Sequence, residues 1–138
     1  MKIFVLKNNS KENITTWMIY SPRDKHFYME LADEAALGDI PMHFAPSYKR
    51  GVRTINSEIS LMWVKARIVP PDRQNIGDIL KDLGMEFYDE FKLLTYNNGL
   101  SSQDDYYIEE IQEQAIAIFL SNRPIKSIVD ICPLPDIL

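Results

Sequence analysis

The chain has 138 residues, enough for one domain with its own hydrophobic core but too few for two comfortable domains. Its 46% hydrophobic and 25% charged residues are typical of a folded globular protein and exclude a disordered tail or a fibrous repeat. The net charge of −5 argues against a nucleic-acid or anionic-membrane surface, so we expect no direct nucleic-acid partner and no membrane.

The cysteine content and the lengths of the apolar runs indicate the cellular compartment of the protein. The single cysteine, Cys132, cannot form an internal disulfide, and no Cys/His cluster has the spacing of zinc ligands. Residues 1–6 are too short for the core of a signal peptide, and no apolar run is long enough to span a membrane. We therefore expect a cytoplasmic protein without a bound metal.

The first part of the chain is predicted to form strands. Residues 2–6 and 15–20 are β-branched and aromatic runs, and the polar stretch between them favours a hairpin. Residues 26–31 alternate between apolar and polar side chains, which is typical of a half-buried third strand. Residues 32–56 are predicted to be a long, partly extended crossing, because Pro41 and Pro46 interrupt any helix there.

The segment 57–67 is predicted to be a helix with Asn56 or Ser57 as its N-cap. Four of its residues share an arc of about 100°, and we expect this stripe to face the core: Ile59, Met62, Trp63 and Ala66. Leu61 and Val64 lie outside the stripe, so this helix has two apolar faces. Burial of both faces in the domain is the favoured interpretation, and a partner covering one face is the alternative.

Two more helices and a strand are predicted after it. Residues 72–83 are predicted to form a helix, because their apolar residues have helical spacing: Ile76, Ile79, Leu80 and Leu83. Gly84 is at the position after the helix where a left-handed backbone conformation is expected. A short helix over 88–96 is followed by residues 106–109, which are predicted to form a short strand, with the start of a helix as the alternative. The fold class is therefore α+β, with a small antiparallel sheet of three to four strands followed by a packed group of three to four helices.

The C-terminal part has its own pattern. A helix is predicted to follow the last strand up to about residue 121, and residues 124–138 hold three prolines among Ile and Val residues. We expect residues 1–110 to form one module. Residues 111–138 are predicted to be a helix and a proline-containing tail that pack on this module or on a partner.

The sequence lacks the standard catalytic patterns. The five glycines are isolated, so no phosphate-binding loop is present, and neither His26 nor His43 has a nucleophile or carboxylate at a motif spacing. The acidic residues Asp104, Asp105, Glu109, Glu110 and Glu113 lack the pattern of a calcium loop and favour a solvated face. We therefore expect a protein that is not an enzyme, with no catalytic residue and no cofactor.

Two sequence segments and the order of the predicted helices and strands resemble those of a known protein family. Residues 41–46 (PMHFAP) are similar to a proline-flanked Pro-Leu-Ser-x-Ser-Leu-Pro motif, and residues 64–70 (VKARIVP) are similar to Phe-Phe-x-Asn-Leu-Leu-Pro, with Arg67 at the asparagine position. Together with the segment 88–94 before Gly99, they make residues 1–110 resemble the first N-terminal subdomain of HipA-like serine/threonine kinases.

The resemblance implies a function. The ATP-binding loop and the catalytic and magnesium-binding aspartates of such a kinase have no counterpart in the sequence. The chain thus resembles the small separate component of three-component, bacterial HipA-type toxin–antitoxin systems. That component acts as an antitoxin that binds the kinase and neutralises it. The resemblance leaves open whether a helix-turn-helix DNA-binding protein joins the complex.

A module that packs on a kinase should keep a docking face, and we expect it on the helix 57–67 and the basic residues after it. The predicted partner-binding residues are Leu61, Met62, Trp63, Val64, Arg67 and Arg73. Trp63 is the expected anchor, and a place in the core is an equally favoured alternative. The alternative function is a small phage or mobile-element protein that inhibits a host defence complex by protein–protein binding.

Overall fold

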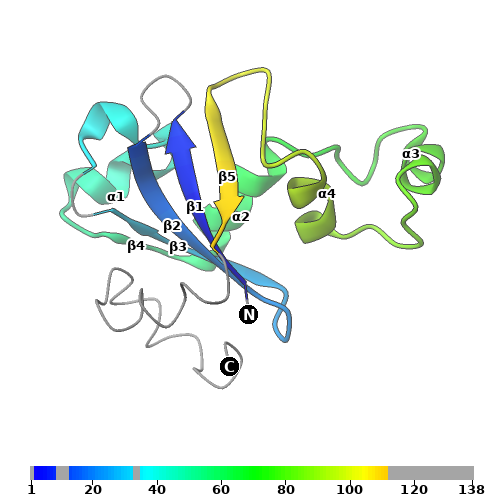
Figure 1. Cartoon of the computed structure of the whole chain (residues 1–138), viewed down its shortest axis with the longest axis horizontal. Coiled ribbons are helices and arrows are strands. Elements are labelled where there is room, and N and C mark those ends of the chain that lie inside the picture. The colour runs from blue at the N-terminus through cyan, green and yellow to red at the C-terminus, as the bar shows by residue number, and fades with distance from the viewer. Residues whose placement is uncertain (1, 9–12, 33–34, 112–138) are drawn as a thin grey trace.

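The computed structural model describes residues 2–8, 13–32 and 35–111, and these form a five-stranded antiparallel sheet with helices (Figure 1). The strands in chain order are β1 (Lys2–Asn8), β2 (Asn13–Ser21), β3 (His26–Leu31), β4 (Thr54–Ile55) and β5 (Tyr106–Glu110). Their spatial order is β4-β3-β2-β1-β5. The α+β prediction is confirmed, with five strands in place of the three to four expected.

The predicted hairpin is the centre of the sheet. Strands β1 and β2 pair with Phe4 opposite Met18, and a register shift follows Leu6. Strand β3 then pairs with β2 so that Met29 lies opposite Met18. Apolar side chains of neighbouring strands therefore line up on one face of the sheet, which is the pairing that buries them together.

The crossing between β3 and α2 is more regular than predicted. It contains two 3-10 turns, Leu37–Asp39 and Met42–Phe44, the short helix α1 (Ala45–Lys49) and strand β4. Pro46 lies in the first turn of α1. The expectation that Pro46 interrupts a helix is wrong, because the first turn needs no backbone N–H from proline.

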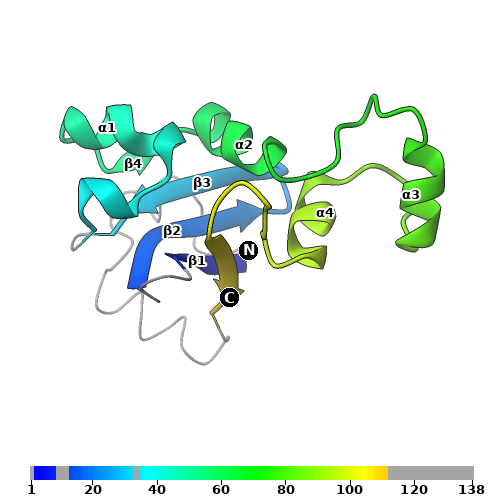
Figure 2. The same ribbon diagram turned by 90° about the horizontal axis from the view of Figure 1, so that it is seen from above.

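Three further helices follow: α2 (Ser57–Lys65), α3 (Ile76–Asp82) and α4 (Glu90–Tyr96). Helices α1 and α2 lie on the same side of the sheet, whereas α3 stands apart from it (Figure 2). None of the helices in the described residues is long and apolar enough to cross a membrane.

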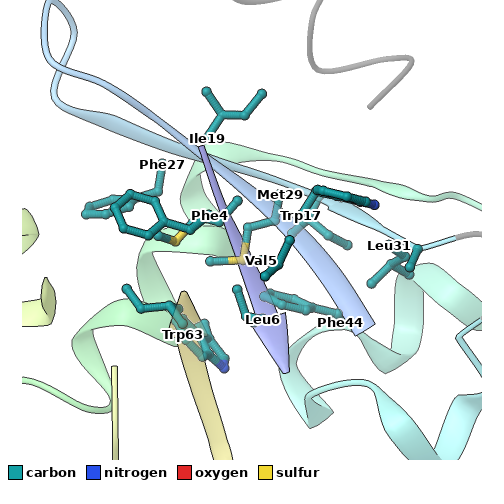
Figure 3. Close-up of a cluster of buried hydrophobic side chains, with 14 of the residues drawn as sticks. Phe4, Val5, Leu6, Trp17, Ile19, Phe27, Met29, Leu31, Phe44 and Trp63 are labelled. Atoms are coloured by element: carbon teal, nitrogen blue, oxygen red, sulfur yellow. The ribbon is translucent and has the colours of Figure 1, made fainter. Parts of the chain in front are cut away.

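The main core lies between the sheet and α2. Trp63, Phe44 and Leu6 gather there with Met29 and Phe4 (Figure 3), and Trp63 is only 1% exposed. Phe91 of α4 extends this core, because its ring stacks on that of Tyr20 at 4.0 Å between centroids. We call the side of the sheet that faces these helices the near face.

Strand β5 is an edge strand that the preceding loop holds in place. The Ile108 amide donates a hydrogen bond to the Asn98 carbonyl oxygen at 2.9 Å, and the Tyr106 amide donates to Asp104 Oδ1 at 3.1 Å. Gly99 has a φ of +70°, and a Cβ there would lie 3.2 Å from the Ile108 side chain. Glycine at this position allows both the turn and the close approach of the loop to β5.

Candidate protein-binding site

Helix α2 carries most of the predicted site residues, and it starts as expected. The Asn56 side chain accepts a hydrogen bond from the Ile59 amide at 2.8 Å, which caps the helix N-terminus. The helix buries Ser60, Trp63 and Val64 against the sheet.

The predicted core stripe of α2 is partly wrong. Met62 is 58% exposed and Ala66 is also exposed, whereas Val64, expected on the other face, is fully buried. The physical reason is the small Ser60 side chain, which lets the helix approach the sheet and donates a hydrogen bond to the Asn56 carbonyl oxygen at 2.8 Å. The buried stripe is therefore rotated toward Ser60 and Val64.

The predicted anchor lies in the core. Trp63 and Val64 are inside the hydrophobic cluster, so a partner does not reach either side chain in this fold. Of the two alternatives for Trp63, the core position is the one observed, and this burial gives no support to the docking role expected for Trp63 and Val64. Leu61 is half-buried, so only Met62 gives α2 a large apolar surface.

Arg67 is also buried, with its side chain 2% exposed. Its guanidinium lies 4.0 Å over the Trp63 ring, its Nε donates to the Gly99 carbonyl oxygen at 2.6 Å, and its Nη2 pairs with Asp104 at 2.5 Å. Burial lowers the pKa of Arg67, and the hydrogen bond and charge of Asp104 oppose this shift. Arg67 therefore joins the end of α2 to the loop before β5, and its burial gives no support to the prediction that it contacts a partner.

Arg73 is exposed and lies in the segment between α2 and α3. It belongs to a projection that we call the arm, residues 70–87, which includes α3 (Figure 1). The base of the arm is closed by Tyr88, whose hydroxyl donates to the Val69 carbonyl oxygen at 2.6 Å. The six predicted residues thus fall into two groups. Trp63, Val64 and Arg67 are buried on α2 or just after it, and Leu61, Met62 and Arg73 are exposed or half-buried on α2 or the arm.

Helix α3 of the arm is shorter than predicted at its start. Residues 72–75 form turns, in which the Ile76 amide donates to the Arg73 carbonyl oxygen, and the helix begins at Ile76. Its end is as predicted. Gly84 has a φ of +72°, its amide donates to Lys81, and the next amide, of Met85, donates to Leu80.

The arm buries none of its apolar side chains. From residue 68 to residue 92 no position is buried, and the apolar stripe of α3 is only half-buried: Ile76, Ile79, Leu80 and Leu83. Phe87, next to the base of the arm, is 78% exposed. Helix α3 stands away from the sheet (Figure 2), so its apolar stripe is not part of the core formed by the described residues.

A groove lies beside Phe87 at the base of the arm. Its volume is about 460 Å³, and Lys25 of the β2–β3 turn, Met85, Tyr88 and Lys92 are among its lining residues. The arm itself carries more acidic than basic side chains. The acidic ones are Asp72, Asp78, Asp82 and Glu86, and the basic ones are Arg73 and Lys81. The arm thus combines an apolar stripe, an exposed aromatic ring and an acidic border.

The other residues with side chains suited to catalysis or metal binding lie in separate parts of the structure. His26 Nδ1 lies 3.2 Å from the Tyr28 hydroxyl, and His43 is exposed on a 3-10 turn. Among the residues that the structure describes, no group of three His, Cys, Asp or Glu side chains could hold a metal ion. Cys132 lies outside the described residues.

The predicted acidic face near β5 is neutralised by ion pairs. Asp104 pairs with Arg67, Glu109 pairs with Lys7 at 2.5 Å, and Glu110 pairs with Lys2 at 3.3 Å. The fifth acidic residue of that set, Glu113, lies outside the described residues. A second cavity of about 510 Å³ adjoins the Lys2–Glu110 pair, and its walls include Phe4, Phe91 and Tyr107.

Comparisons with known proteins give no relative: no family model, no curated protein and no solved structure matches the chain.

Proposed function

We propose that this protein is a non-catalytic binding module of the cytoplasm that binds and neutralises or regulates a HipA-like serine/threonine kinase. The observation that carries the proposal is the arm, whose apolar stripe and Phe87 have no covering element among the described residues. Apolar side chains kept together at a surface are typical of a protein-docking site. The resemblance of residues 1–110 to the kinase subdomain is the reason for proposing a kinase of this family as the partner.

The side chains of the arm also indicate the chemistry of the partner surface to which the arm would bind. An exposed aromatic ring next to aliphatic side chains requires an apolar groove on the partner. The acidic side chains Asp78, Asp82 and Glu86 favour lysine or arginine along the border of that groove. We therefore infer a kinase surface with an apolar groove bordered by basic residues.

The alternative function, inhibition of a host defence complex, has less support. An acidic protein that mimics nucleic acid needs its carboxylates free on one face. Here Asp104, Glu109 and Glu110 are occupied by cations of the same chain. We keep this alternative as an outcome of the experiment below.

The experiment is growth of cells that express a HipA-like kinase, with and without the affinity-tagged protein. The expected result is rescue of growth and co-purification of the kinase. Persistent growth arrest with no co-purified kinase would overturn the proposal. Co-purification of a defence complex in its place would favour the alternative function.

Two matched variants test the arm. Phe87→Ala removes an exposed aromatic ring from the arm and should weaken kinase binding about tenfold, as expected for a central interface residue. Tyr96→Ala removes a similarly exposed ring from α4, outside the arm, and should leave binding unchanged. Affinities measured by calorimetry on purified kinase check both. Equal affinities for the two variants would exclude the arm as the docking site.

A further inference from the structure

The connection between β3 and α2 forms a basic surface at one end of the molecule. Residues 40–57 contain Lys49, Arg50 and Arg53 and no acidic residue, although the whole chain has a net charge of −5. Lys49 and Arg50 are exposed where α1 ends. Arg53 is exposed as well, and its Nη1 donates a hydrogen bond to the Ala32 carbonyl oxygen at 2.7 Å. We call the surface of residues 42–53 the α1 end.

The α1 end also exposes apolar side chains. Met42, in the 3-10 turn before α1, is 89% exposed, and Val52, shortly after α1, is 45% exposed. The exposed cations and the exposed apolar side chains therefore belong to the same short segment. Apolar side chains among charges of one sign are typical of a surface that binds a partner of the opposite charge.

The arm has the opposite charge. It carries four acidic and two basic residues, and Asp78 and Asp82 are four residues apart in α3, so they lie on the same face of this helix. The apolar stripe of α3 is only half-buried, and Phe87 is 78% exposed. The arm and the α1 end are therefore complementary in charge, and both expose apolar side chains.

The two surfaces do not meet within one molecule. Figure 1 shows α1 and α3 near opposite ends of the long axis, with the sheet between them. The hydrogen bond from the Tyr88 hydroxyl to the Val69 carbonyl oxygen, 2.6 Å long, closes the base of the arm on the side away from α1. A contact between the arm and the α1 end must therefore join two molecules.

From this complementarity and this separation, we propose that the protein associates with itself, with the arm of one copy bound to the α1 end of another. The contact places the carboxylates of α3 beside Lys49 and Arg50. It also places the apolar stripe of the arm against Met42 and Val52. Because the two surfaces differ, the contact is heterologous. This inference goes beyond the proposed function, since a second copy on the arm would compete with a kinase for the same surface.

Sedimentation velocity of the purified full chain, without a kinase, tests the inference. The mean sedimentation coefficient should rise with protein concentration and fall with added salt, because salt screens the charges. Two charge-reversed chains are compared, one with Asp78→Lys and Asp82→Lys in the arm and one with Lys49→Glu and Arg50→Glu at the α1 end. Each alone should associate about tenfold more weakly, because like charges then face each other.

An equimolar mixture of the two reversed chains should recover the association, because each arm again meets an α1 end of opposite charge. Asp24→Lys, on the exposed β2–β3 turn and outside both surfaces, is the control and should associate like the natural protein. Three results would overturn the inference: a natural protein that stays monomeric at every concentration, reversed chains that associate as the natural protein does, or a mixture without recovery. Since no kinase is present, failure of the proposed function would leave these measurements unchanged.

Discussion

Arg67 shows how one side chain can join three parts of the fold. Its guanidinium stacks on Trp63 of α2, donates to Gly99 after α4 and pairs with Asp104 before β5. A planar guanidinium can serve all three contacts at once, whereas a lysine ammonium has neither the fork nor the flat surface. The sequence could place an arginine near the end of the helix, but it could not show that distant residues enclose it.

Removal of this guanidinium should destabilise the domain. Arg67→Ala leaves Asp104 without its cation and should lower the free energy of unfolding by about 3 kcal/mol. The exposed Arg73→Ala is the matched control and should change it by less than about 0.5 kcal/mol. Urea unfolding of the three proteins measures both values. A similar loss for the two variants would contradict the structural role of Arg67.

Tyr106 gives the domain a pH dependence. Burial, with smaller contributions from the charges of Asp104 and Asp39, raises the pKa of Tyr106 to about 12. Its hydroxyl donates to the Asp39 carbonyl oxygen at 2.8 Å. The folded protein therefore keeps this proton at a pH where the unfolded chain, with its ordinary tyrosine pKa of 10.0, releases it.

The sign of the effect follows from this difference. The contribution of Tyr106 to stability is complete below pH 10 and is lost as the pH rises toward its folded pKa of about 12. The free energy of unfolding should therefore fall less steeply over this range in Tyr106→Phe than in the natural protein. Tyr96→Phe, on the exposed part of α4, serves as the control. Parallel curves for Tyr106→Phe and the natural protein would contradict the assignment.

At the scale of elements, α3 and α4 differ although both are short and amphipathic. Helix α4 is capped by the Asp89 side chain, which accepts from the Lys92 amide at 2.9 Å, and it buries Leu93 and Leu94. Helix α3 buries none of its residues. Because helices of this length are marginal without tertiary packing, the arm should open more readily than the body of the domain.

Two leucine substitutions measure this contrast. Leu94→Ala should lower the free energy of unfolding by about 3 kcal/mol, because it leaves a cavity in the core. Leu80→Ala removes the same group from the arm and should lower it by less than about 1 kcal/mol. Thermal and urea unfolding check the pair. An equal effect would show that the arm packs on the body of the domain.

Hydrophobic periodicity and turn residues predicted which helices and strands exist, but not which other parts of the structure pack against them. The hairpin, the end of α3 at Gly84 and the helix before Asn97 follow from local chemistry. The placement of α3 does not, because Ile76, Ile79 and Leu80 have the same spacing whether a core or a partner covers them. Likewise, Trp63 and Met62 are neighbours in one apolar stretch, and only the approach of α2 to the sheet determines which is buried.

At the scale of the whole molecule, the described residues form a packed body and a projection. The sheet, α2 and α4 share one core, and the arm extends from it between Val69 and Tyr88. The candidate site could be predicted from the sequence only as a class of surface, apolar with nearby charge. We propose the arm as its location in place of α2, because long-range packing buries Trp63 and Val64 and leaves α3 uncovered.

The two edges of the sheet have a consequence for how the molecule behaves at high concentration. Strand β4 has two residues, and β5 has its Tyr106 and Ile108 amides occupied by the preceding loop. Within the described part of the chain, neither edge offers a long row of free donors on which another chain could add a strand. The fold therefore resists edge-to-edge aggregation, and the apolar arm can be displayed without the sheet itself becoming a template for fibrils.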